Sequence, residues 1–101
     1  MEKIKIDIPK DKIADFCRRW KVRELSLFGS AIREDARPDS DIDVLVSFKE
    51  DAPWSVFDLI EMTGELKTFF GREVDLVEKE ALRNPFRRHS ILTNREVIYA
   101  A

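Results

Sequence analysis

Gly29-Ser30-Ala31-Ile32-Arg33, followed seven residues later by Ser40-Asp41-Ile42-Asp43, is the stretch of sequence that decides the fold of this chain. Residues 25–28 are mostly apolar and run into the glycine, so the small-residue turn follows a predicted strand. Residues 41–48 place an apolar side chain at every second position, which is typical of a strand with one buried face. The pattern predicts a turn and an arginine just ahead of two strand carboxylates, an arrangement suited to a nucleoside triphosphate and its magnesium ions.

Asp41 and Asp43 are two residues apart in this predicted strand. Their side chains should share one face, with Cα atoms roughly 6.6 Å apart at a rise of about 3.3 Å per residue. At an effective dielectric constant of about 20, two carboxylates about 6 Å apart repel by roughly 2–3 kcal/mol. A divalent cation removes this repulsion, and Mg²⁺ is usually held by one or two carboxylates together with substrate phosphates. Asp75, in a predicted strand at 73–78, can join the pair if the two acidic strands are neighbours.

Length and composition fit a single domain, residues 1–101, with a modest core, since 44% of the residues are hydrophobic and 38% are charged. The net charge of −2 gives no basic excess, so we expect no direct nucleic-acid partner. The single Cys17 excludes an intrachain disulfide and, with one histidine, a Cys/His zinc cluster. No signal peptide and no membrane-spanning run is visible, which predicts a cytoplasmic protein without membrane contact.

The remaining pattern alternates helices with strands. The predicted elements are an extended arm at 4–8, a helix at about 13–20, a strand at about 23–28, a helix at about 55–70, a strand at 73–78, short helical turns within 79–92, and a strand at 96–99. Ser55 and Asp58 resemble a capping box, and Gly71 stops the longer helix. This alternation predicts an α/β (α+β) fold, with helices packed on a small mixed β-sheet.

The pattern Gly-Ser-x-x-Arg, a short spacer and Ser-Asp-x-Asp, with a further acid at Asp75, resembles the minimal nucleotidyltransferases of the polymerase-β-like superfamily. Within that superfamily the chain is most similar to the small MNT-type antitoxins, the partners of HEPN-domain ribonuclease toxins. The resemblance covers nearly the whole chain, including residues 36–40, 73–79 and 97–99. It implies the nucleotidyltransferase fold and a Mg²⁺-dependent transfer of AMP from ATP to a hydroxyl group, with pyrophosphate as the leaving group.

The resemblance also assigns the catalytic carboxylates. Two Mg²⁺ ions are expected on Asp41, Asp43 and Asp75, where they stabilise the attacking and leaving oxygens of an in-line displacement. Asp75 either completes the metal site on the attacking side or acts as the base that takes the acceptor proton. The sequence leaves both roles of Asp75 open.

Four further residues are expected to bind the nucleotide. Gly29 allows a close approach of backbone to phosphate, and Ser30 can donate its hydroxyl and amide at a helix start. Arg33 supplies a cation for the departing phosphates, while Ser40 either touches phosphate or serves the turn. Glu34 departs from the family pattern, because many members have glycine there, and a carboxylate near the triphosphate path weakens nucleotide binding unless it points outward.

The 101 residues are taken up by a catalytic core, so the acceptor is expected to be small or to be presented by a partner. The MNT-type resemblance implies a tyrosine of the HEPN toxin, whose ribonuclease is silenced by AMPylation, which makes this chain an antitoxin. One alternative is a binding module that neutralises the toxin by occlusion, with chemistry incidental or lost. Another is a small-molecule nucleotidyltransferase of the antibiotic-resistance kind, which the lack of an acceptor-binding domain disfavours.

Overall fold

The computed structural model describes residues 8–29 and 41–101 of the chain. In chain order these residues form α1 (Lys10–Arg19), β1 (Val22–Phe28), β2 (Ile42–Phe48), α2 (Val56–Phe70), β3 (Val74–Glu78), the short 3₁₀ helix η2 (Lys79–Ala81), α3 (Pro85–Thr93) and β4 (Arg95–Ala100). The described strands form one mixed sheet in the order β3-β2-β1-β4, in which β2 and β3 are parallel and the other neighbours are antiparallel. This architecture confirms the predicted α+β fold.

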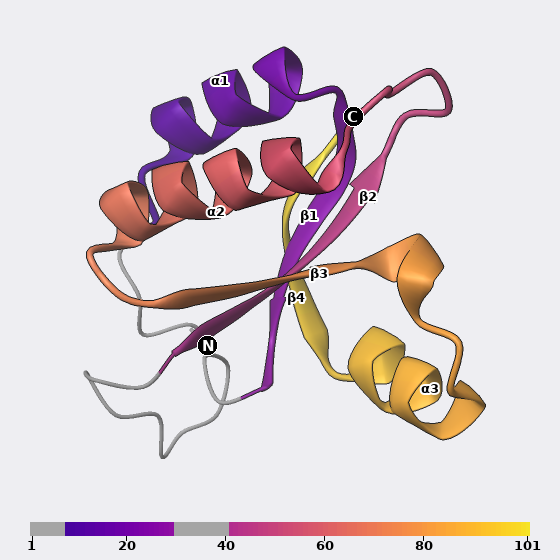
Figure 1. Cartoon of the computed structure of the whole chain (residues 1–101). Coiled ribbons are helices and arrows are strands. Elements are labelled where there is room, and N and C mark those ends of the chain that lie inside the picture. The colour runs from indigo at the N-terminus through magenta and orange to yellow at the C-terminus, as the bar shows by residue number, and fades with distance from the viewer. Residues whose placement is uncertain (1–7, 30–40) are drawn as a thin grey trace.

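The sheet is covered differently on its two sides (Figure 1): α1 and α2 lie side by side over one side, and α3 lies on the other. Ile42, Val44 and Val46 of β2 are buried in the larger core, together with residues of α1 and α2. Leu45 points to the opposite side, because successive strand residues alternate, and there it packs with Ile91 of α3 in a smaller cluster. One side of the sheet is therefore closed by two helices and the other only in part.

The ends of the helices follow from local sequence. The Ser55 hydroxyl accepts a hydrogen bond from the Asp58 backbone N–H, and the Asp58 carboxylate accepts one from the Ser55 N–H at 2.9 Å, which confirms the predicted capping box. Gly71 ends α2 with φ of 67°, a left-handed conformation that favours glycine. In the same way, Asn84 Oδ1 accepts a hydrogen bond from the Phe86 N–H at 3.0 Å and starts α3.

Some element boundaries differ from the sequence prediction. β2 begins at Ile42, so Asp41 precedes the strand, and the first ladder bond on this side runs from the Ile42 N–H to the Glu73 carbonyl at 2.9 Å. The turns predicted within 79–92 are η2 and a longer α3. Of the arm predicted at 4–8, all but Ile8 lies outside the described residues.

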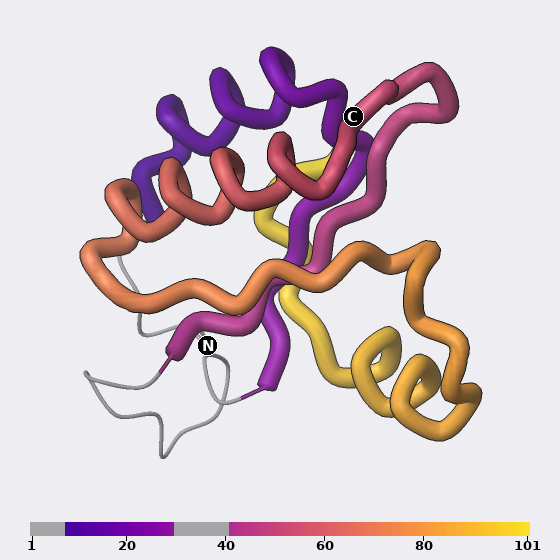
Figure 2. Tube along the Cα trace, viewed as in Figure 1, coloured from indigo at the N-terminus to yellow at the C-terminus, as the bar shows by residue number. Residues whose placement is uncertain are grey.

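The last strand, β4, runs back to the start of β1. The Ala101 N–H donates a hydrogen bond of 2.8 Å to the Arg23 carbonyl, so the C-terminal end lies beside the start of β1 (Figure 2). In the part of the chain that the structure describes, no helix combines the length and the apolar character needed to cross a membrane.

Cys17 provides a test of the packing of α1 against the sheet. Its side chain is fully buried, and this burial raises the pKa of the thiol to about 12, although the charge of Arg18 acts in the opposite direction. We predict that the folded protein does not react with Ellman's reagent at pH 8, whereas the protein in guanidinium chloride releases one equivalent per chain, because the thiolate is the reactive species. Rapid stoichiometric reaction of the folded protein would contradict this packing.

The same pKa shift predicts a pH dependence of stability. The unfolded thiol ionises near its ordinary pKa of about 8.5, so above that pH the unfolded state holds fewer protons than the folded state. The Cys17 contribution to the free energy of unfolding should therefore fall as the pH rises from about 9, and this slope should be missing in Cys17→Ala.

Candidate active site

The parallel pairing of β2 and β3 brings two of the predicted catalytic carboxylates together. Asp43 and Asp75 are register partners on these neighbouring strands, whose backbones are about 4.8 Å apart in an ordinary sheet. On its other side Asp43 is paired with Phe28, the last residue of β1. Three segments that are far apart in the sequence thus lie side by side at one end of the sheet: the last residue of β1, Phe28, and the second residues of β2 and β3, Asp43 and Asp75. The condition that β3 lies beside the acidic strand is met.

Gly29 sits against the carboxylate of Asp43. Its φ is +67°, and a Cβ built on it would lie 2.3 Å from Asp43 Oδ2 and 3.3 Å from Asp43 Cγ. No real side chain tolerates such distances, so any residue larger than glycine must displace the carboxylate. From the sequence, Gly29 is expected to let the backbone approach a phosphate. In the structure, its missing side chain also leaves room for the Asp43 carboxylate.

The predicted catalytic acids are accessible to solvent, as a ligand-binding site requires. Asp75 and Asp41 are exposed and Asp43 is half-buried. Asp43 lies two residues before Leu45, so it projects from the side of the sheet that α1 and α2 leave open. Charged groups on this side keep their hydration until a ligand arrives, whereas on the closed side they would lose it at a high cost in free energy.

The donor set fits a hard divalent cation. Carboxylates on neighbouring strands offer the oxygen ligands that Mg²⁺ takes, and Mg²⁺ commonly completes its shell with water and substrate phosphate. Within residues 8–29 and 41–101, however, no three His, Cys, Asp or Glu side chains are grouped closely enough to hold a metal ion by themselves. An ion at this site would therefore depend on oxygens from water and a triphosphate, and the metal assignment of Asp41, Asp43 and Asp75 stays a prediction.

The predicted nucleotide-binding residues Ser30, Arg33 and Ser40 lie outside the described residues, as does Glu34, so their roles also stay predictions. Arg95 is a cation near the site that sequence reasoning missed. It starts β4 opposite Phe28, but its guanidinium is paired with Glu24, further back along β1. No local pattern marks this residue, because the β1–β4 pairing that places it is long-range.

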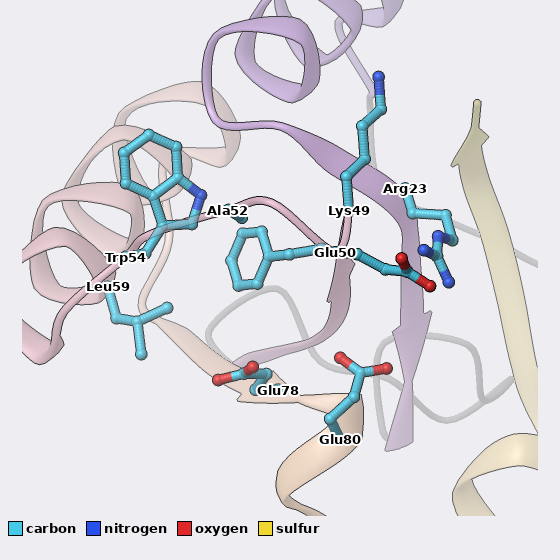
Figure 3. A pocket seen from close by; sticks show the side chains of 9 residues that line it. Arg23, Lys49, Glu50, Ala52, Trp54, Leu59, Glu78 and Glu80 are labelled. Carbon is cyan, nitrogen blue, oxygen red and sulfur yellow. The ribbon is translucent and has the colours of Figure 1, made fainter.

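A pocket of about 290 Å³ opens at the opposite end of the sheet (Figure 3). Its lining includes Phe48 at the end of β2, Trp54, and the carboxylates of Glu78 and Glu80. Phe48 is five residues beyond Asp43, about 16 Å along the strand at about 3.3 Å per residue. This pocket is thus distinct from the end of the sheet where the acids meet.

Proteins of known family resemble this chain in sequence. The family model described as a nucleotidyltransferase domain matches residues 10–98. The chain is 41% identical, over 80% of its own length and 77% of the relative's, to the protein adenylyltransferase MntA of Thermococcus cleftensis.

Two solved structures share the fold. One is a toxin–antitoxin structure with AMP-PNP, with a TM-score of 0.73 and 21% identity, covering 93% of this chain and 75% of that one. The other contains a tri-AMPylated HEPN toxin of Shewanella oneidensis in complex with an MNT antitoxin, with a TM-score of 0.64 and 19% identity over 91% of this chain and 70% of that one. At these identities the likeness shows the fold alone.

Gly29 and Gly71 form a matched pair for testing the contact with Asp43. Both have a φ of +67°, but a Cβ at Gly71 would meet nothing within 4 Å. Gly71→Ala should therefore lower the free energy of unfolding by about 1–2 kcal/mol through backbone strain alone. Gly29→Ala should lower it by more, because it adds the collision with the Asp43 carboxylate.

Urea denaturation measures both effects. In an Asp43→Ala background, Gly29→Ala should lose its extra penalty and match Gly71→Ala. Equal penalties for the two glycine variants in the wild-type background would show that Asp43 does not pack on Gly29.

Proposed function

Because this chain belongs to the nucleotidyltransferase domain family, we propose that it transfers AMP from ATP to a hydroxyl group, a tyrosine, of a HEPN-domain ribonuclease toxin and so acts as the antitoxin. The observation that carries the proposal is the register of Asp43 with Asp75, beside Gly29 and on the open side of the sheet. The cytoplasm, where ATP and Mg²⁺ are plentiful, is the expected site of the reaction.

Each of the three carboxylates has a proposed part. Asp41, Asp43 and Asp75 would hold two Mg²⁺ ions. When bound, these ions would neutralise charge on the triphosphate and on the attacking and leaving oxygens. Strand pairing on both sides fixes the backbone of Asp43, and Gly29 leaves room for its carboxylate, so we propose that this carboxylate is positioned before any ligand binds. Such preorganisation lowers the barrier because little reorganisation remains for the transition state.

The reaction itself is a displacement at the α-phosphorus of ATP. The tyrosine oxygen forms a bond to this phosphorus, the bond to the bridging oxygen of the β-phosphate breaks, and pyrophosphate leaves with the electron pair. The phenolic proton passes to Asp75 or to water, since Asp75 is exposed and can meet the acceptor. Arg33 and Ser30 are proposed to hold the departing phosphates and the nucleotide.

The names of the relatives support a protein as the acceptor. The Thermococcus relative is called a protein adenylyltransferase. A structural neighbour contains a HEPN toxin that carries AMP groups. A HEPN-domain protein encoded next to this chain is therefore the acceptor to test first.

Mass spectrometry tests the transfer. With ATP, Mg²⁺ and the HEPN-domain partner, the wild-type chain should add one or more adenylyl groups to a partner tyrosine. Asp43→Asn should abolish the mass gain, because a neutral amide is a poorer Mg²⁺ ligand. Asp11→Asn, which changes an exposed carboxylate of α1, is the matched control and should leave the transfer unchanged.

The same experiment separates transfer from occlusion, the alternative that the departure from the family pattern at Glu34 favours. If the wild-type chain adds no mass while Asp43→Asn still neutralises the ribonuclease stoichiometrically, occlusion is the mechanism.

Thermal melting tests ligand binding without a partner. At ten times the dissociation constant, MgATP should stabilise the folded state by about 1.4 kcal/mol. This corresponds to a rise in Tm of about 5–10 °C for a domain of this size. The Asp41→Asn/Asp43→Asn variant should show a much smaller rise. Indistinguishable shifts of the variant and the wild type, or none in either, would count against a nucleotide–metal site at these residues.

A further inference from the structure

Exposed apolar side chains gather at the start of α2. Val56, Phe57 and Ile60 are 69%, 82% and 63% exposed, and the described residues include only two other large exposed apolar side chains, Phe86 and Val97. A concentration of this kind within two helical turns marks an interaction surface more often than chance exposure does.

The second half of the same helix carries small residues, Gly64, Thr68 and Gly71. A Cβ at Gly64, in the middle of α2, would meet nothing within 4 Å, and the same holds for Gly71 at its end. The Thr68 hydroxyl donates to the Gly64 carbonyl at 3.1 Å, so its polar group is turned back to the helix backbone. A glycine inside a helix costs about 0.5–1 kcal/mol relative to alanine, and nothing within the described chain needs this one.

Helical geometry places these residues on one face. At 3.6 residues per turn, the positions that lie within about 60° of the direction of Gly64 are Phe57, Ile60, Glu61, Lys67, Thr68 and Gly71. Their positions are balanced about Gly64. Ile60 and Thr68 lie four residues to either side, Glu61 and Lys67 three, and Phe57 and Gly71 seven. Each large or acidic residue therefore has a small or basic counterpart.

We propose that this face of α2 binds a second copy of the chain, with the two α2 helices antiparallel across a two-fold axis at Gly64. Antiparallel pairing sets Phe57 over Gly71 of the second copy, and Ile60 over Thr68 of the second copy. A crossing of about 20°, in which rows three apart on one helix pack into rows four apart on the other, keeps both helices in contact from Phe57 to Gly71. A two-fold axis makes each contact twice, which is the arrangement of most soluble dimers.

Charge fixes the direction of the pairing. In the antiparallel arrangement Glu61 faces Lys67 of the second copy, so opposite charges meet on both sides of the axis. A parallel arrangement would bring Glu61 against Glu61 and Phe57 against Phe57, which combines repulsion with crowding. Lys67 also lies 3.1 Å from Glu73, but both side chains are exposed, and such a pair contributes little.

The proposed interface leaves the active site open. α2 covers the side of the sheet that is opposite to Asp43 and Asp75, so a dimer through α2 keeps both carboxylates accessible to nucleotide and acceptor (Figure 1). The inference stands apart from the AMP transfer, because it rests only on α2.

Sedimentation velocity over a range of concentrations tests the dimer. The mass should rise from the 11.8 kDa of one chain towards twice that value. Ile60→Asp should keep the chain monomeric, while Phe86→Ser, which removes a still more exposed apolar side chain on α3, should leave the association unchanged. A wild-type chain that stays monomeric up to about 1 mM, where even an association of about −4 kcal/mol would be half complete, overturns the proposal.

Charge reversal tests the register. Glu61→Lys and Lys67→Glu should each weaken the dimer at least tenfold, and the double variant should recover most of this loss. A double variant as weak as the single variants would overturn the antiparallel register about Gly64.

Cross-linking gives a second, independent readout. Gly64→Cys should form a disulfide-linked dimer with diamide under native conditions, because the two residues meet at the crossing point, whereas Phe86→Cys should not. The natural Cys17 is buried and does not interfere. If the chain is monomeric and Ile60→Asp instead abolishes binding of the HEPN-domain partner, the face belongs to that partner and the homodimer is excluded.

Discussion

The parallel pairing of β2 with β3 is the constraint on which the rest of this structure depends. Parallel strands need a long crossover, and α2 provides it, with Met62 and Leu66 buried against the sheet. The register of this pair sets which side chains meet. A slip of β2 by one residue would turn Asp43 into the core, away from Asp75, and would expose Val44 and its neighbours. Burial of the alternate apolar residues of β2 thus fixes the register that places Asp43 beside Asp75.

The two sides of the sheet have different roles: one contains most of the hydrophobic core, and the other carries the candidate site. The side under α1 and α2 supplies most of the buried apolar area and therefore most of the stability. The other side is only partly covered by α3, and there the paired carboxylates reach solvent. Placing charge on the less covered side avoids a desolvation penalty, and Gly29 leaves the space that the Asp43 carboxylate occupies.

Most of the fold was predictable because its signals are local. The alternation in β2, the capping box of Ser55 and Asp58, and the stop at Gly71 each depend on neighbours in sequence. What local patterns do not contain is strand order. The pairing of Asp43 with Asp75 was only conditional, and the placement of Arg95 beside Phe28 was not anticipated.

In the candidate site, too, local features were predictable from the sequence and long-range contacts were not. The motif includes Gly29 and the acids, but it does not predict the contact between Gly29 and Asp43, because that contact depends on how the end of β1 pairs with the start of β2. Asp41 was expected inside the strand and lies just before it, since the ladder begins with the bond from the Ile42 N–H to the Glu73 carbonyl. Such offsets of one residue are typical of strand ends.

Paramagnetic NMR tests the central claim most directly, namely that nucleotide and metal bind where β1, β2 and β3 meet. With Mn²⁺ and a non-hydrolysable ATP analogue, we expect the amide signals of Gly29, Asp43 and Asp75 to broaden beyond detection. The signals of Lys49 and Asp51, which lie beyond the far end of β2, should broaden least. Broadening centred on Lys49 and Asp51, or none at Asp43 and Asp75, would contradict the account.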